Sequence, residues 1–243
     1  MFEIIDDLKA KLDQRRPLSP VIVKNLHEDL ILRWTYHSNT IEGNTLTLLE
    51  TKVVLEGITV GGKALREHFE EINHRDAIFY IQDIIKKEEP FSEWQIRNIH
   101  QFILKNIDNE NAGRYRQQNV LISGATTHPP DHTLLNDKMA QFIEWYNTEA
   151  HNLHPVERAT KIYADFVGIH PFVDGNGRTS RLLMNLELMK AGYPPSVITI
   201  KNRLAYYEAL DQWVEYGNTE PFINLIARVV LDGFKPYQIV LGI

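Results

Sequence analysis

Apolar residues recur at steps of three and four along most of the 243-residue chain, and this spacing favours a protein built mainly of α-helices. Leu30 and Trp34 belong to the first such run, and Gly43 is placed to end that helix in the left-handed conformation. The same spacing predicts a long helix over residues 65–87, and Pro155 is typical of the first turn of another. We therefore expect a mainly α fold.

One segment departs from the helical spacing. Residues 113–132 contain a β-rich run over 119–123, followed by Gly124 and two adjacent prolines. Such a run, bounded by turn-forming residues, is typical of short strands joined by a turn. The sequence therefore predicts one β-hairpin within an otherwise helical chain.

Composition narrows the function classes. The chain has 26 Lys and Arg against 32 Asp and Glu, so its net charge of −6 gives no electrostatic reason to expect a nucleic acid or an anionic membrane as partner. It has no cysteine, which excludes disulfides, thiolate metal sites and a cysteine nucleophile. No run approaches the roughly 20 apolar residues of a membrane helix, and the start MFEIIDDLKAKL does not resemble a signal peptide. We expect a cytoplasmic protein.

The segment HPFVDGNGRTSR, residues 170–181, carries the most chemistry. Gly175 and Gly177 flank Asn176 and allow a tight turn whose backbone N–H groups can converge on an anion. The spacing predicts a helix over about 178–189, whose N-terminus would direct further unpaired N–H groups at the same loop. This arrangement is typical of a phosphate-binding site.

The charged residues of the same segment fit that interpretation. Arg178 and Arg181 lie near a helix N-terminus, where cations are unfavourable unless an anion neutralises them. Asp174 would be repelled by a phosphate unless a divalent cation, of which Mg²⁺ is the expected one, lies between them. His170 could accept a proton beside the phosphate. Together these groups point to phosphoryl or nucleotidyl transfer.

Each of these residues alone has an ordinary explanation. A histidine before a proline commonly ends a helix, DGNG is commonly a turn, and an arginine is commonly an exposed partner in an ion pair. Their combination within 12 residues favours a site, because each supplies a different requirement of one reaction.

HPFVDGNGRTSR also resembles the signature of the Fic family, at every position of that signature. Four further blocks resemble family motifs: SNTIEGNT over 38–45 the autoinhibitory motif, QNVLISGATTHPP the hairpin flap, NLHPVE over 152–157 the helix start before the signature, and AYYEAL over 205–210 a Tyr-Tyr motif. The blocks extend from about residue 36 to residue 225. They are especially similar to the class with an N-terminal inhibitory helix, to which the animal endoplasmic-reticulum enzymes belong.

The resemblance implies a Fic-fold helical bundle with a β-hairpin flap, and protein AMPylation: transfer of AMP from ATP to a Ser, Thr or Tyr hydroxyl of a target protein, the chain itself included. It makes His170 the base that deprotonates the hydroxyl and Asp174 the Mg²⁺ ligand. The implied nucleotide-binding residues are Asp174, Gly175, Asn176, Gly177, Arg178, Arg181, Tyr206 and Tyr207. The flap residues Ile122, Ser123 and Gly124 would align the target as an added strand.

Glu42 and Ser38 belong to the implied inhibitory motif. On sequence position alone, a helical Glu before a glycine would face solvent. The resemblance instead pairs Glu42 with Arg181, where its carboxylate would take the place of the γ-phosphate, and also implies that it can align water for AMP removal. The implied division of the chain is an N-terminal helical region over 1–65 and a Fic core over 66–243, with the flap at about 114–131.

Other functions stay open at this point. Another nucleotide or a phospho-group could be transferred, or the chain could be a non-catalytic module that senses nucleotides. A metal hydrolase is disfavoured, because the histidines of the chain form no HExxH motif and His151 and His154 lack a nearby third ligand. The target protein, the balance between AMPylation and its reversal, and the oligomeric state, for which a homodimer is one alternative, are not fixed by the sequence.

Overall fold

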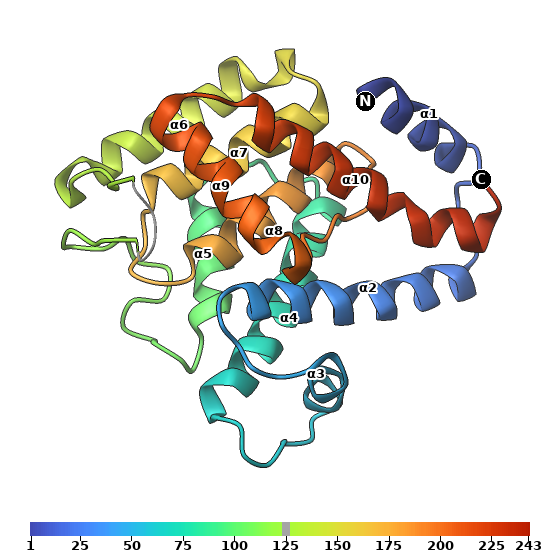
Figure 1. Cartoon of the computed structure of the whole chain (residues 1–243), viewed down its shortest axis with the longest axis horizontal. Helices are drawn as coiled ribbons and strands as arrows, with labels where there is room; N and C mark the ends of the chain where they lie inside the picture. The colour runs from blue at the N-terminus through green and yellow to red at the C-terminus, as the bar shows by residue number, and fades with distance from the viewer. Residues whose placement is uncertain (123–126) are drawn as a thin grey trace.

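The computed structural model describes residues 1–122 and 127–243 as an assembly of α-helices joined by loops and three short 3₁₀ turns (Figure 1). The α-helices are α1 (Phe2–Asp13), α2 (Pro20–Ile41), α3 (Leu48–Leu55), α4 (Leu65–Lys86), α5 (Glu93–Leu104), α6 (Leu135–Thr148), α7 (Pro155–Ile169), α8 (Asn176–Lys190), α9 (Arg203–Tyr216) and α10 (Glu220–Leu241). The 3₁₀ turns are η1 (His132–Leu134), η2 (Ala150–Asn152) and η3 (Ile200–Asn202). The mainly α fold expected from the sequence is confirmed. None of the helices in the described ranges combines the length and apolar character needed to cross a bilayer.

Several helix boundaries follow from local signals in the sequence. Gly43 has a φ of +102° directly after the end of α2, a conformation that glycine adopts without the cost a Cβ would add. Thr47 and Glu50 form a reciprocal capping box at the start of α3. Pro155 is the first residue of α7, as predicted. The division predicted between residues 65 and 66 falls at the start of α4 and stays a prediction.

Helix α8 lies in the middle of the molecule and is buried along most of its length, paired with α7. Met184 and Leu188 join an apolar cluster that also includes residues of α1, α7, α9 and α10. Leu182 and Leu186 join a second cluster, formed with α4, α5 and α6. Because both sides of α8 are packed, the residues at its N-terminus are held on a rigid support.

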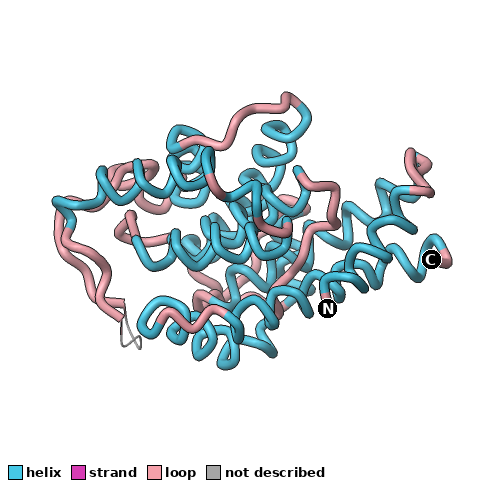
Figure 2. The backbone as a smooth tube through the Cα atoms, turned by 90° about the horizontal axis from the view of Figure 1, so that it is seen from above, coloured by secondary structure: helices cyan, strands magenta, loops and turns pink. Residues whose placement is uncertain are grey.

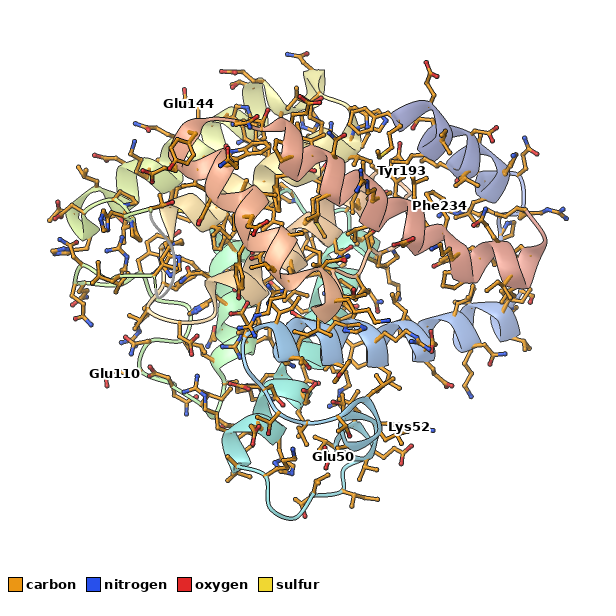
Figure 3. The ribbon with its side chains drawn as sticks, in the orientation of Figure 1. Glu50, Lys52, Glu110, Glu144, Tyr193 and Phe234 are labelled. Carbon is orange, nitrogen blue, oxygen red and sulfur yellow. The ribbon has the colours of Figure 1, made fainter. Side chains whose placement is uncertain are left out.

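Helix α1 packs beside α10 at the outer end of the first cluster. Tyr193, in the loop after α8, and Phe234, on α10, meet there edge to face, with ring centroids 6.5 Å apart (Figure 3). The Tyr193 hydroxyl donates to Asp6 on α1 at 2.7 Å. The N-terminal helix is thus joined to the core by both apolar and polar contacts.

The predicted β-hairpin is not shown. The described parts of the flap, residues 114–122 and 127–131, contain no strand and run as loops on either side of the residues drawn in grey (Figure 2). Side chains, rather than paired backbones, link these two parts: the Arg116 guanidinium donates to the Gln118 and Pro130 carbonyls, and the Asn119 amide donates to Asp131 at 2.8 Å. Ser123 and Gly124 lie outside the described residues.

Candidate active site

The candidate base, His170, ends α7 in the left-handed conformation, with a φ of +50° that is unusual for a residue other than glycine. Its carbonyl accepts a hydrogen bond from Arg116 Nε at 2.9 Å, and the next carbonyl, of Pro171, accepts from the Arg116 N–H at 2.9 Å. Burial of the ring, followed by the charge of Arg116, lowers the pKa of His170 to about 4. The imidazole is therefore neutral at pH 7 and able to accept a proton.

The loop between α7 and α8 is closed by the Asn176 side chain. Its Oδ1 accepts from the Phe172 N–H at 3.0 Å and its Nδ2 donates to the Phe172 carbonyl at 2.8 Å. Helix α8 begins at Asn176, two residues earlier than the predicted start at Arg178. Its first N–H groups have no partner within the helix and are available to an anion.

Beneath this loop lies His100, on α5, which the sequence analysis did not select. Its ring stacks on Phe172 with centroids 3.5 Å apart, Nδ1 accepts from the Gly113 N–H at 2.9 Å, and Nε2 lies 2.9 Å from the Asp174 carbonyl oxygen. Because Nδ1 accepts, Nε2 carries the proton and donates to Asp174. Burial lowers the pKa of His100 to about 4. The neutral ring therefore links Gly113, directly before the flap, to Asp174 in the loop.

Asp174 occupies the centre of the loop's charged groups. Its Oδ1 accepts from the Gly175 N–H at 2.6 Å and from Arg178 at 3.1 Å, and its Oδ2 accepts from Arg66 at 2.6 Å. Burial raises the pKa of Asp174, but Arg178, the Gly175 N–H and Arg66 outweigh burial and leave that pKa below its ordinary value. The side chain is 44% exposed, so an ionised carboxylate faces the open side of the loop.

Arg181 extends from α8 to the C-terminal end of α2, which reaches α4 and α8 from one side of the bundle (Figure 1). Its NH2 donates to Glu42 Oε1 at 2.6 Å and to the Ser38 carbonyl at 2.9 Å, and its Nε donates to the Ser38 hydroxyl at 3.0 Å. Burial opposes the positive charge, but the Glu42 carboxylate outweighs it, so the pKa of Arg181 lies above its ordinary value. The side chain is only 2% exposed; Nε and NH2 are held by these two residues, whereas NH1 has no hydrogen-bond partner among the described residues.

Gly177 explains how Glu42 comes so close to the start of α8. A Cβ built on Gly177 would collide with the Glu42 carboxylate oxygen. The missing side chain therefore leaves room for an acidic group over the first turn of α8, where the helix dipole favours negative charge.

Helix α4 fixes the segment that carries Glu42. Asn39 Nδ2 donates to the Glu70 carbonyl at 3.2 Å and to Glu71 Oε2 at 3.1 Å, while Asn44 Nδ2 donates to Glu70 Oε2 at 2.9 Å. Glu71 is completely buried, and burial raises its pKa well above the ordinary value. These acidic residues of α4 were not selected from the sequence, because as single residues on a long helix they show no pattern.

The structure brings most of the residues selected from the sequence into one site: His170, Asp174, Gly175, Asn176, Gly177, Arg178, Arg181, Ser38 and Glu42. The two tyrosines differ. Tyr206 is buried against Tyr163 in the first apolar cluster, whereas Tyr207 is 39% exposed and its hydroxyl lies 3.4 Å from the carbonyl oxygen of Ile41 at the end of α2. Ile122 is half-buried in the flap.

The residues from 90 to 188 match a family model described as the Fic/DOC family. The protein adenylyltransferase Fic of Nematostella vectensis is 38% identical over 231 residues, covering 94% of this chain and 53% of that protein. The protein adenylyltransferase fic-1 of Caenorhabditis elegans is 33% identical over 94% of this chain and 45% of its own length. The chain thus spans about half the length of the curated relatives it matches.

Solved structures agree with the sequence matches. A Fic domain containing signaling protein from Bacteroides thetaiotaomicron superposes with a TM-score of 0.90 at 30% identity, over 98% of this chain and 97% of that one. A structure of Fic-1 from C. elegans superposes with a TM-score of 0.88 at 29% identity, over 99% of this chain and 71% of that one.

Proposed function

The chain belongs to the Fic/DOC family, and from that premise we propose that it transfers AMP from ATP to a Ser, Thr or Tyr hydroxyl of a protein. The curated relatives that cover most of this chain carry the name protein adenylyltransferase, which supports the proposal. The observation that carries it is the juxtaposition of a neutral His170 with the N-terminus of α8 and its two buried arginines.

In the proposed reaction His170 takes the proton of the attacking hydroxyl. The hydroxyl oxygen then forms a bond to the α-phosphorus of ATP, and the bond between that phosphorus and the bridging oxygen of the β-phosphate breaks, so pyrophosphate leaves. A ring with a pKa of about 4 is unprotonated throughout the neutral range and accepts the proton as the new bond forms.

The phosphates would lie on the first N–H groups of α8, with Arg178 and Arg181 supplying positive charge. Gly177 adds no side chain of its own to that surface, where the Glu42 carboxylate now lies. The pairing of Arg181 with Glu42 supports the further proposal of autoinhibition, because a γ-phosphate and the Glu42 carboxylate would compete for one guanidinium. Release of Glu42 would then precede productive binding of ATP, and the same carboxylate could orient water for the reverse reaction.

Asp174 fits a role as the protein ligand of Mg²⁺, because its carboxylate is ionised and partly exposed beside the proposed phosphate site. Within residues 1–122 and 127–243 no group of three or more His, Cys, Asp or Glu gathers as a metal cage. Mg²⁺ commonly takes one or two carboxylates and completes its shell with phosphate oxygens and water, which suits a single Asp174. When bound it would neutralise phosphate charge during transfer.

The target would lie along the flap. The described flap residues present an exposed Leu121 and a half-buried Ile122, with backbone groups not paired to each other, and an extended target segment could add to such a backbone as a strand. Arg116 supports this placement, since one guanidinium contacts both parts of the flap and the carbonyl of His170. Tyr207, at the edge of the site, is our candidate for a contact with the adenine.

The test uses ATP labelled either at the α- or at the γ-phosphate, with Mg²⁺, the chain and its Glu42→Gly and His170→Ala variants. The proposal expects the α-label to become covalently attached to protein and the γ-label to stay in solution, most strongly with Glu42→Gly and not with His170→Ala. Attachment of the γ-label would instead indicate phosphoryl transfer. Bound nucleotide with neither label attached would indicate a binding module and would contradict the proposed reaction.

A further inference from the structure

Asp174 already has a positively charged partner from a distant part of the chain. Arg66, in the first turn of α4, donates from NH2 to Asp174 Oδ2 at 2.6 Å across 108 residues of sequence. The other carboxylate oxygen is engaged by the Gly175 N–H and by Arg178. Arg66 therefore occupies the carboxylate oxygen that these loop and α8 residues do not engage.

The Arg66 side chain is fixed at a second point. Its Nε donates to Glu70 Oε1 at 3.0 Å, one turn further along α4. Glu70 is itself held, because its Oε2 accepts from Asn44 at 2.9 Å and its Oε1 lies 3.5 Å from Arg178 NH1. Although Arg66 is 57% exposed, its guanidinium is thus directed at Asp174 by a partner that is only 13% exposed.

A divalent cation at the same carboxylate oxygen would meet this guanidinium. Mg²⁺ binds carboxylate oxygens at about 2.0–2.1 Å. Arg66 NH2 stands 2.6 Å from Asp174 Oδ2, so the two positive groups would compete for that oxygen and repel each other. Arg66 therefore opposes the binding of a cation at Oδ2 as long as it stays there.

In both halves of the site, a side chain of this chain takes the position that we assign to a charged group of the substrate complex. At Arg181, the Glu42 carboxylate stands where we place a phosphate, and at Asp174, the Arg66 guanidinium stands where we place the metal cation. Asn44, two residues after Glu42, contacts Glu70, which directs Arg66. The two contacts are therefore linked by the backbone from Glu42 to Asn44 and by the side-chain hydrogen bonds from Asn44 through Glu70 to Arg66.

We propose that Arg66 is a competitor of the divalent cation at Asp174, so that it sets the cation concentration at which the nucleotide complex forms. The proposal rests on the proposed function in one respect: it assumes that the cation binds together with ATP. Removing Arg66 is expected to tighten cation binding about two- to fivefold, the range that the loss of one partly exposed ion pair supports.

The experiment measures the dissociation constant of Mn²⁺, by the electron paramagnetic resonance signal of the free ion, with a non-hydrolysable ATP analogue present. It compares the chain with Arg66→Ala and with Arg66→Lys, which keeps a positive charge. The matched control is Arg33→Ala, because Arg33 is 54% exposed and likewise pairs with an acid one helical turn away. Thermal unfolding of each variant verifies that it is folded.

We expect Arg66→Ala to bind Mn²⁺ two- to fivefold more tightly, Arg66→Lys to change less, and Arg33→Ala not to change. In an Asp174→Asn background the effect of Arg66→Ala should vanish. Unchanged or weaker Mn²⁺ binding by Arg66→Ala overturns the proposal, as does absence of Mn²⁺ binding by all variants. Weaker binding of the analogue to Arg66→Ala without any cation would make Arg66 a phosphate ligand instead. The experiment measures cation binding and not AMP transfer, so its result can be interpreted even if the proposed reaction does not occur.

Discussion

Replacement of Glu42 by glycine is the substitution whose effect on the rate of AMP transfer can best be calculated from the structure. The Glu42–Arg181 hydrogen bond is 2.6 Å long, and hydrogen bonds to charged groups contribute about 1.5–3 kcal/mol. Glu42 is 34% exposed, so solvent screens its charge and the lower end, about 1.5 kcal/mol, applies. Since 1.4 kcal/mol corresponds to a factor of ten, Glu42→Gly is expected to raise the transfer rate about tenfold.

The assay is the initial rate at which the α-phosphate label of ATP becomes attached to protein. Glu56→Gly is the matched control, because Glu56 also ends a helix, α3, and also precedes a glycine with positive φ, Gly57, but pairs with the exposed Lys52. Both variants place a glycine at a helix end, and only one of them releases Arg181. Equal rates for the chain and Glu42→Gly, or the same gain with Glu56→Gly, would refute the reasoning.

Four further predictions concern the residues around the base and the loop. In Glu42→Gly the transfer rate should stay nearly constant from pH 7.5 to 5.5, because His170 takes up a proton only near pH 4; a steep loss centred near 6.5, the ordinary value for histidine, would contradict the lowered pKa. Since the pKa values of His100 and His170 are both lowered, unfolding should become easier as the pH falls from about 6.5 towards 4, as measured by denaturant midpoints at each pH. His100→Ala should lower the free energy of unfolding by about 2–4 kcal/mol, because it removes a packed ring and leaves the Gly113 N–H and the Asp174 carbonyl without their partner; a loss under about 1 kcal/mol would argue against this bridge. Arg116→Ala should reduce transfer to protein while nucleotide binding is kept, which a titration with an ATP analogue checks; equal loss of both would mean that Arg116 acts on the loop and not on the flap.

The helices could be predicted because their signals are local. Gly43, the Thr47–Glu50 box and Pro155 each act within one turn of the helix boundary that they define, and apolar spacing marks the buried face between such boundaries. The loop 170–181 is equally local, since its turn, its helix start and its charged groups are consecutive in sequence.

The flap could not be predicted in the same way. A run of β-favouring residues indicates only that a segment can form a strand. The described flap segments are instead linked by the side chains of Arg116 and Asn119, and strand propensity does not predict such contacts. Arg116 does not stand out in the sequence, because Arg114, Gln117 and Gln118 surround it with other polar residues.

Residues that support the site from other helices were missed for a related reason. His100, Glu70 and Arg66 lie on helices that begin at least 70 residues before α8, and each is one polar residue among many on its helix. Their importance comes from partners that only the fold brings near: Asp174 for two of them and Asn44 for the third. Spacing along one helix holds no information about such partners.

The most direct test of the account is the intact mass of the Glu42→Gly chain after incubation with ATP and Mg²⁺, measured beside Glu42→Gly/His170→Ala. The account predicts that the first protein, or a target protein added to it, gains the mass of one or more AMP groups, and that the double variant gains none. A gain that persists without His170 would contradict its role as the base. No gain in either protein, with ATP shown to bind, would contradict AMP transfer itself.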